Sequence, residues 1–499
     1  MAVKKLLALA FVAAIGVSSA DAATLRVALQ DDPDTLDPAT GGTYTGRIVF
    51  AALCDKLVDI DQNLGIVPEL ATEWSWNDDS TALTMKLREG VTFHDGSPFD
   101  AEAVKANIER MKTMEDSRRK GELSPISDVE VVDDHTVILK LETPFAPLLS
   151  VLSDRAGMMV APSAAGSSDE FTANPVCSGP YKFVSRQARD KIALEKYDGY
   201  WNADEIGYDA VEYLIIPDST VRLSRLRAGD LEAAERIAPT DLGTVRGDSS
   251  LALHTSPGLA VSHLFIKQSG EGAGILAEHP ELRHALELSI DRNVINQVAF
   301  DGEFLADNQM IPPSSAFYSK AHPMPARDVE KAKALIEESG VENPAFTITF
   351  ENSLTDARVA QIIQAMASEA GFEVTLLPLE TSSAIERYLA GNFEAYIGNW
   401  SGRADPDPTL YTFFGMNGSQ NLNGYKSEPL EEVLLAARQE LDEDKRKALY
   451  EEAAGIYLED LSTIPLYHST WFYAANADVE GITMYPDGIL RLVGVHPAN

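Results

Sequence analysis

The stretch that decides the fold is FTITFENS (346–353), followed by DARVAQIIQAMASEAG (356–371), FEVTLLPL (372–379), SSAIERYLAG (382–391) and FEAYIGNW (393–400). Three segments rich in β-branched and aromatic residues alternate with two amphipathic segments that end on glycine, a common helix stop. This alternation predicts a β-α-β-α-β unit with a parallel sheet and right-handed crossovers. The second half of the chain is therefore expected to be α/β.

The segment NWSGRADPDP (399–408) starts at the end of the last predicted strand. Ligands of open parallel sheets bind beyond the carboxyl ends of the strands, so this segment is expected to face a cleft. Two Asp-Pro steps stiffen the backbone beside Asp405 and Asp407, so that ordering these carboxylates costs little entropy. Taken alone, the segment is compatible with a catalytic carboxylate pair, a metal site or a grip for a charged small molecule.

The first half of the chain has a different pattern. Residues 24–30 predict a short strand, 47–60 an apolar helix, and 128–142 and 179–201 an antiparallel hairpin each. The connection SPGLAVSHLFIKQSG (256–270) has Gly and Pro around a strand-like middle, which suits a crossover or hinge. A chain of 499 residues is long enough for about two or three domains.

Residues 1–22 are typical of a secretory signal peptide. Two lysines precede the apolar run LLALAFVAAIGV (6–17), and ADA (20–22) forms a small-x-small cleavage site. The alternative, an N-terminal membrane anchor, is disfavoured because the apolar run is short for a span. The sequence therefore predicts a soluble, exported product that starts near Ala23 and is retained in a periplasm.

The chain has two cysteines, Cys54 and Cys177. Neither lies in a CxxC pair, and two cysteines cannot build a four-cysteine zinc site. In an oxidising compartment an even pair far apart in sequence suggests one disulfide, whereas two free, buried cysteines are the alternative.

Charge and motif content exclude several classes of protein. The formal net charge is −36, and so acidic a surface repels phosphate backbones, which excludes nucleic acid as a partner. The sequence contains no GxxxxGK[ST], GxGxxG, GxSxG or HExxH motif, and its nine histidines are scattered. We therefore expect no metal, no cofactor and no enzymatic activity; a secreted hydrolase that uses paired carboxylates is a remote alternative.

A series of motifs occurs in the order known from one protein family. They are TLDPATGG, VPELATEWSWNDD, LREGVTFHDGSPFDAEAVKANIER, SGPYKF, KYDGYW, RLRAGDLE, LRHALELSIDR, EKAKALIEESG and NWSGRADPDP. With them the chain resembles the extracellular solute-binding proteins of family 5, the peptide- and nickel-binding receptors of ABC importers. LREGVTFHDGSPFDAEAV (87–104) is specific by itself, and the ordered set covers essentially the whole chain after the signal peptide.

The resemblance implies an α/β fold of the two-lobed periplasmic-binding-protein type II, with an extra subdomain in the first lobe. The expected boundaries are 23–55, 177–262 and 472–499 for lobe I, 56–176 for the inserted subdomain and 263–471 for lobe II. The implied function is to capture a small peptide or peptide-like solute and deliver it, as a monomer, to an ABC permease driven by a cytoplasmic ATPase. Glutathione-like peptides, opines, oligosaccharides and metal chelates are alternative ligands, and a chaperone-like or sensory receptor is a third interpretation.

The same resemblance assigns roles to charged residues. Asp405 matches the carboxylate that holds the ligand's ammonium group in peptide-binding relatives, and Asp407 is the alternative. Arg358 matches an arginine at the start of the long second-lobe helix, which binds the ligand carboxylate in dipeptide-binding relatives. The planar guanidinium fork suits a carboxylate, although a surface arginine is the simpler explanation.

Arg403 departs from the dipeptide pattern, because it adds a cation to the segment. Either it pairs with one of the two aspartates there, or it binds an anionic group of the ligand. Trp400 is expected to stack on the ligand or to pack under the loop. Tyr44 and Thr45, in the segment GGTYTG (41–46) after the first strand, are expected to face the ligand from the first lobe.

Overall fold

The computed structural model describes residues 23–498, so the predicted signal peptide lies outside the described residues. Within the described part, no helix is long and apolar enough to cross a membrane. One large mixed sheet runs through the molecule. Its strands, in spatial order, are β15 (Glu373–Leu379), β14 (Ala345–Glu351), β16 (Ala395–Trp400), β12 (Leu251–Ile266), β17 (Thr463–Asn476), β11 (Ala233–Ala234), β1 (Thr24–Leu29), β10 (Ala210–Ile215), β9 (Lys191–Lys196) and β8 (Tyr181–Gln187), with β13 (Leu305–Ala306) beside β17.

The second lobe is built around β14, which pairs in parallel with β15 and β16. Helices α12 (Leu354–Ala370) and α13 (Thr381–Leu389) make the crossovers, so the predicted β-α-β-α-β unit is confirmed. Ser353 caps α12 by accepting a hydrogen bond from the Asp356 amide, and Gly371 ends it in the left-handed conformation. The remaining helices of this lobe are α8 (Ile275–Glu278), α9 (Pro280–Ser289), α10 (Arg292–Phe300), α11 (Val329–Ser339), α14 (Asp407–Phe414), α15 (Glu428–Gln439) and α16 (Glu443–Asp460).

The first lobe holds the other end of the large sheet. Strand β1 pairs in parallel with β10 and β11, and β8 and β9 form the predicted hairpin. The predicted helix 47–60 is wrong at both ends, because α1 spans Tyr44–Leu53 and residues 58–60 form β2, paired with β3 (Ile66–Pro68). The other helices of this lobe are α5 (Ser168–Ala173), α6 (Ser219–Arg227) and α7 (Leu242–Gly247).

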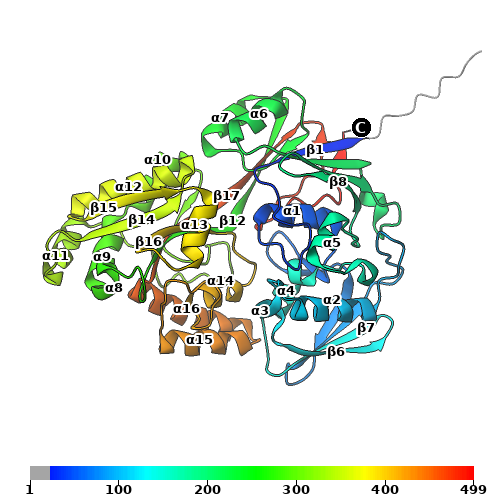
Figure 1. The fold of residues 1–499 in the computed structure, drawn as a ribbon, viewed down its shortest axis with the longest axis horizontal. Helices are drawn as coiled ribbons and strands as arrows, with labels where there is room; N and C mark the ends of the chain where they lie inside the picture. The colour runs from blue at the N-terminus through cyan, green and yellow to red at the C-terminus, as the bar shows by residue number, and fades with distance from the viewer. Residues whose placement is uncertain (1–22, 499) are drawn as a thin grey trace, which may run out of the picture.

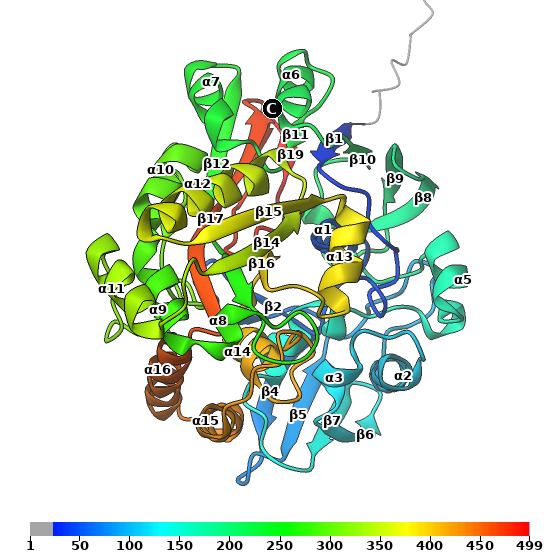
Figure 2. The same cartoon turned by 60° about the vertical axis from the view of Figure 1, so that its left-hand side comes forward.

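A separate antiparallel sheet lies beside the first lobe and has its own apolar core (Figure 2). Its order is β4 (Ala71–Trp76), β5 (Ala82–Leu87), β7 (Thr136–Leu141) and β6 (Ile126–Asp133), joined by α2 (Ala101–Thr113), α3 (Lys120–Leu123) and α4 (Leu148–Leu152). We call this part the inserted subdomain. The predicted 128–142 hairpin is present, whereas the exact lobe boundaries stay a prediction. Asp100 caps α2 by accepting a hydrogen bond from the Ala103 amide.

Two long strands join the lobes. Strand β12 pairs with β17 along nearly its whole length, and Figure 1 shows the two running side by side between the lobes. Residues 251–257 of β12 lie in the first lobe, and residues 261–266 pair with β16 of the second lobe. The register shifts between Pro257 and Val261, a bulge that locally interrupts the pairing. The connection predicted as a crossover or hinge thus crosses between the lobes as part of an antiparallel ribbon with an irregular middle, and its role as a hinge stays a prediction.

Cys54 and Cys177 are bonded, which is one of the two alternatives that the sequence left open. His94 lies beside this bond. The Cys177 amide donates to His94 Nδ1 at 3.3 Å, so the proton sits on Nε2, which donates to the Gly179 carbonyl at 3.0 Å. This neutral ring is largely buried, and burial lowers the pKa of His94 to about 4.

We expect His94 to make folding sensitive to mild acid. Its pKa is lower in the folded than in the unfolded chain, so below about pH 6.5 the unfolded chain takes up a proton first. The free energy of unfolding should therefore fall by about 1 kcal/mol per pH unit between roughly pH 6 and 4.5 from this group. The free energy of unfolding, measured with urea at several pH values in this range, should depend less steeply on pH in His94→Gln than in the wild type. His279→Gln, a change at a half-buried histidine, is the control and should keep the pH dependence of the wild type. If the free energy of unfolding depends equally on pH in His94→Gln and the wild type, His94 is not the group responsible.

Candidate functional site

The loop of residues 401–406 joins β16 to α14 and touches the inserted subdomain. The Asp405 amide donates to Ser150 Oγ in α4 at 3.2 Å, and Arg403 Nε lies 2.9 Å from an Asp154 carboxylate oxygen. Figure 1 shows α14 opposite α3 and α4. The segment predicted to face a cleft therefore lies where the second lobe contacts the inserted subdomain.

The same loop is seated on the bulged part of β12. Gly402 has φ +70°, and a Cβ on it would lie 2.2 Å from the Leu259 carbonyl oxygen. Only glycine fits this backbone conformation at such close approach. The loop thus contacts both β12 and the inserted subdomain.

The Asp405 carboxylate is already bound to a cation of its own lobe. Arg446 of α16 donates to both Asp405 oxygens, at 2.5 and 2.7 Å, and also to the Tyr450 hydroxyl at 2.9 Å. One Asp405 oxygen also accepts from the Asp407 amide at 2.9 Å. A ligand ammonium would have to share this carboxylate with Arg446, so the ammonium-binding role of Asp405 stays a prediction.

Asp407 begins α14 and points into the second lobe. Its carboxylate lies 3.0 Å from Arg438 Nε, and the Arg438 guanidinium lies over the Tyr411 ring at 3.9 Å. Burial raises the pKa of Asp407 to about 7, although the charge of Arg438 opposes this shift. Its alternative role toward a ligand ammonium also stays a prediction.

Arg403 pairs with neither aspartate of its segment. Each of those already has a cation within its lobe, and Arg403 instead reaches Asp154 of the inserted subdomain. Trp400 packs under the loop: its Nε1 donates to Thr409 Oγ1 at 3.0 Å and its ring meets Phe413 edge-on. The Arg403 guanidinium lies over the Trp400 ring at 4.9 Å. The ligand roles of Arg403 and Trp400 stay predictions.

The other predicted site residues lie elsewhere. Arg358 is exposed on α12 and forms no ion pair within residues 23–498. Tyr44 starts α1 rather than lying in a loop; its ring stacks on Trp471 of β17, and its hydroxyl donates to the Gly488 carbonyl at 2.6 Å. Thr45 is buried beside it. Their contact with a ligand stays a prediction.

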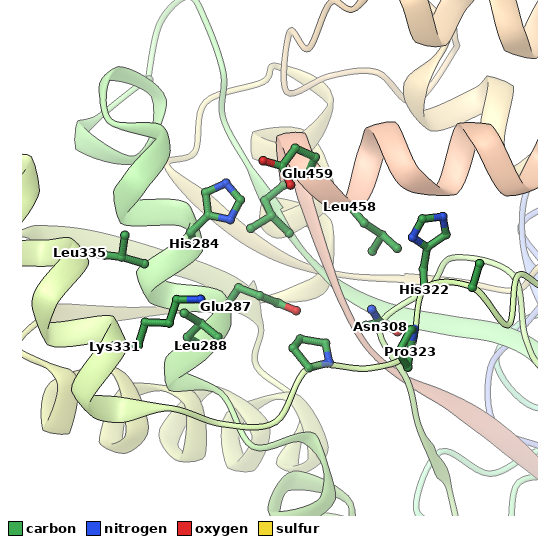
Figure 3. A pocket seen from close by; sticks show the side chains of 13 residues that line it. His284, Glu287, Leu288, Asn308, His322, Pro323, Lys331, Leu335, Leu458 and Glu459 are labelled. Carbon is green, nitrogen blue, oxygen red and sulfur yellow. The ribbon is translucent and has the colours of Figure 1, made fainter.

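A hollow of about 560 Å³ lies on the second lobe, away from the 401–406 loop (Figure 3). It is lined by side chains from α9, α11, α16 and the segment after β13, among them His284, His322 and Lys331. Glu287 at the wall of the hollow forms a buried ion pair with Arg292, at 2.7 Å, so its carboxylate already has a partner inside the lobe. Among residues 23–498, no three His, Cys, Asp or Glu side chains group to hold a metal ion.

The family model of the bacterial extracellular solute-binding proteins, family 5 Middle, matches residues 65–421. The chain belongs to this family. The dipeptide-binding protein of Escherichia coli (strain K12) is 26% identical, over 97% of this chain and 96% of that protein. A glutathione-binding protein of Pectobacterium atrosepticum is 28% identical, over 91% of this chain and 90% of that protein.

A solved structure is similar over the same length. DppA from Helicobacter pylori, in complex with the peptide STSA, has a TM-score of 0.85 at 25% identity and covers 95% of this chain and 98% of its own. The predicted two-lobed α/β fold and the general function, a solute-binding protein of an ABC importer, are thereby confirmed.

Proposed function

We propose that this family member captures a small peptide or peptide-like solute between its lobes in the periplasm, without chemical conversion, and delivers it to an ABC permease. The observation that carries the proposal is the 401–406 loop, which places the Arg403 guanidinium against Asp154 and the Asp405 amide against Ser150 where the second lobe meets the inserted subdomain. The peptide and glutathione ligands of the relatives support the solute class.

The geometry explains how closure and binding are coupled. The loop packs closely against β12 at Gly402 and contacts the inserted subdomain through Ser150 and Asp154. A solute held between these walls is removed from water, so its charge pairs and hydrogen bonds strengthen. A ligand that binds this closed form therefore stabilises it, and the permease can recognise the closed protein.

A thermal-shift screen with dipeptides, tripeptides, oligosaccharides and metal chelates tests the proposal. A ligand at about 100 times its Kd adds about 2.7 kcal/mol to the free energy of unfolding, so a peptide should raise the unfolding midpoint. A shift with an oligosaccharide and with no peptide, or turnover of a bound peptide, would contradict it.

A pair of glycine variants tests whether the loop takes part. Gly402→Ala should weaken peptide binding because the new Cβ strikes the Leu259 carbonyl. Gly90→Ala is matched, since Gly90 has φ +75° but no atom within 4 Å of its Cβ position. Equal peptide affinity of the two variants would exclude the loop from binding.

A further inference from the structure

Four arginine side chains converge where the parts of the molecule meet. Arg47 comes from α1 of the first lobe, Arg119 from the start of α3, Arg155 from the turn after α4, and Arg403 from the second lobe. Arg47, Arg119 and Arg155 are at most 5% exposed, in a chain whose net charge is −36. We call these four residues the arginine cluster. Since charged groups are rarely buried unless they are paired, we expect anions to lie beside it.

The anions in place do not balance the arginine cluster. Asp154 is its centre: one carboxylate oxygen accepts from Arg47 Nε at 3.0 Å and the other lies 2.9 Å from Arg403 Nε. Arg119 is held by the half-exposed Glu122 at 2.5 Å. Four positive charges thus face two negative ones, which leaves an excess of two.

The pKa shifts of Asp154 and Arg155 agree with this excess. Burial raises the pKa of Asp154, but the surrounding arginines outweigh it and hold that pKa well below its usual range. Burial and the charge of Arg119 bring the pKa of Arg155 well below its usual range. Asp487, which also acts on Arg47, is already paired with Arg491 at 3.0 Å. Arg155 also forms the longest ion pair of the four arginines, with its Nε 3.9 Å from an Asp154 oxygen.

Several donors of the arginine cluster have no acceptor. Arg155 Nη1 donates to the Gly41 carbonyl at 2.8 Å, but Arg155 Nε, Arg119 Nε and Arg47 Nη1 are buried without a hydrogen-bond partner among the described residues. Buried donors are normally satisfied, and a guanidinium edge matches a carboxylate with two parallel hydrogen bonds. The unused donors come from both the first lobe and the inserted subdomain.

We propose that the arginine cluster binds a solute that carries at least two carboxylates, either an acidic peptide or a non-peptide polycarboxylate. The inference rests on the proposed capture of a solute between the lobes and narrows its chemical class. Asp154 orders the guanidinium groups and links Arg47 of the first lobe to Arg403 of the second, so closure completes the site. A neutral dipeptide, with one carboxylate, would leave one positive charge uncompensated.

Calorimetric titration of the mature protein tests this with Ala-Gln, Ala-Glu and tricarballylate. Ala-Gln and Ala-Glu differ by one carboxylate at nearly equal size, so Ala-Glu or tricarballylate should bind at least tenfold more tightly than Ala-Gln. Arg155→Gln should remove most of that preference, because the second carboxylate loses its guanidinium partner. Arg227→Gln, on the exposed face of α6, is the control that should leave all affinities unchanged.

The calorimetric results for the three probes distinguish failure of the cluster proposal from failure of the proposed peptide capture. If Ala-Gln and Ala-Glu bind equally and tricarballylate does not bind, the cluster proposal fails while peptide capture stands. If tricarballylate alone binds, the cluster proposal holds and peptide capture fails. If neither Ala-Glu nor tricarballylate binds, the cluster proposal also fails.

The unfolding midpoint without ligand tests for a purely structural role. Removing one of several like charges should leave the midpoint of Arg155→Gln unchanged or raise it. A clear drop, with the anion preference retained, would make Arg155 a structural residue and overturn the proposal.

Discussion

Replacing Cys54 and Cys177 together with alanine is expected to lower the free energy of unfolding by about 3 to 5 kcal/mol. The bond closes a loop with a sequence separation of 123 residues, and a crosslink of that length strongly restricts the unfolded chain. It also ties the end of α1 to the segment before β8, where the Gly179 amide donates to the Leu53 carbonyl at 2.8 Å. Urea unfolding of the oxidised wild type and the double variant measures the difference.

One control and one choice of probes make this prediction testable. The wild type unfolded with reductant should resemble the double variant, because both lack the crosslink. Because two lobes can unfold in separate steps, tyrosine and tryptophan fluorescence should be followed together with circular dichroism. A loss below about 1 kcal/mol would mean that the unfolded chain is already compact around these residues.

Arg446→Met should lower the free energy of unfolding by about 3 to 5 kcal/mol, because it leaves the buried Asp405 carboxylate without its cation. The side chains of Arg446 and Asp405 are only 6% and 10% exposed, so water cannot replace the lost partner. The Tyr450 hydroxyl loses its donor as well. Denaturant unfolding near neutral pH measures the effect.

Two further variants identify the cause. Asp405→Asn combined with Arg446→Met removes both charges and keeps an acceptor for the Asp407 amide, so it should recover much of the loss. Arg246→Met breaks the exposed pair with Glu303 and should cost at most about 1 kcal/mol. If Arg446→Met loses no more free energy of unfolding than Arg246→Met does, the buried pair of Arg446 and Asp405 does not stabilise the fold.

The elements that local pattern could predict are those whose signals lie within a few residues. The strands and helices between residues 345 and 400 follow their periodicity and glycine stops, and the hairpins follow their turns. The start of α1 was predicted too late, at residue 47, although a local signal existed, because Thr43 accepts from the Gly46 amide as a helix cap. Its end has no such signal: Cys54 is extended where it bonds to Cys177, a distant constraint that local propensity does not contain.

The contacts of the candidate site were beyond local pattern for the same reason. Arg446 lies 41 residues from Asp405, on a helix whose surface is charged along its length, so nothing marked it as the partner. Arg47, Arg119 and Arg155 lie in no motif that the sequence analysis singled out, and the motif around Arg403 does not indicate which residues it contacts. Only the fold brings Arg47, Asp154 and Arg403 together.

The position of strand β17 near the end of the chain limits when each lobe can complete its folding. It is one of the last elements of the chain, yet it pairs with β11 in the first lobe and with β12 in both lobes. A growing chain can therefore complete neither lobe until residue 476 is available, and both then close around the same strand. Such late, long-range pairing favours slow folding and leaves two apolar sheet edges open until synthesis is nearly over.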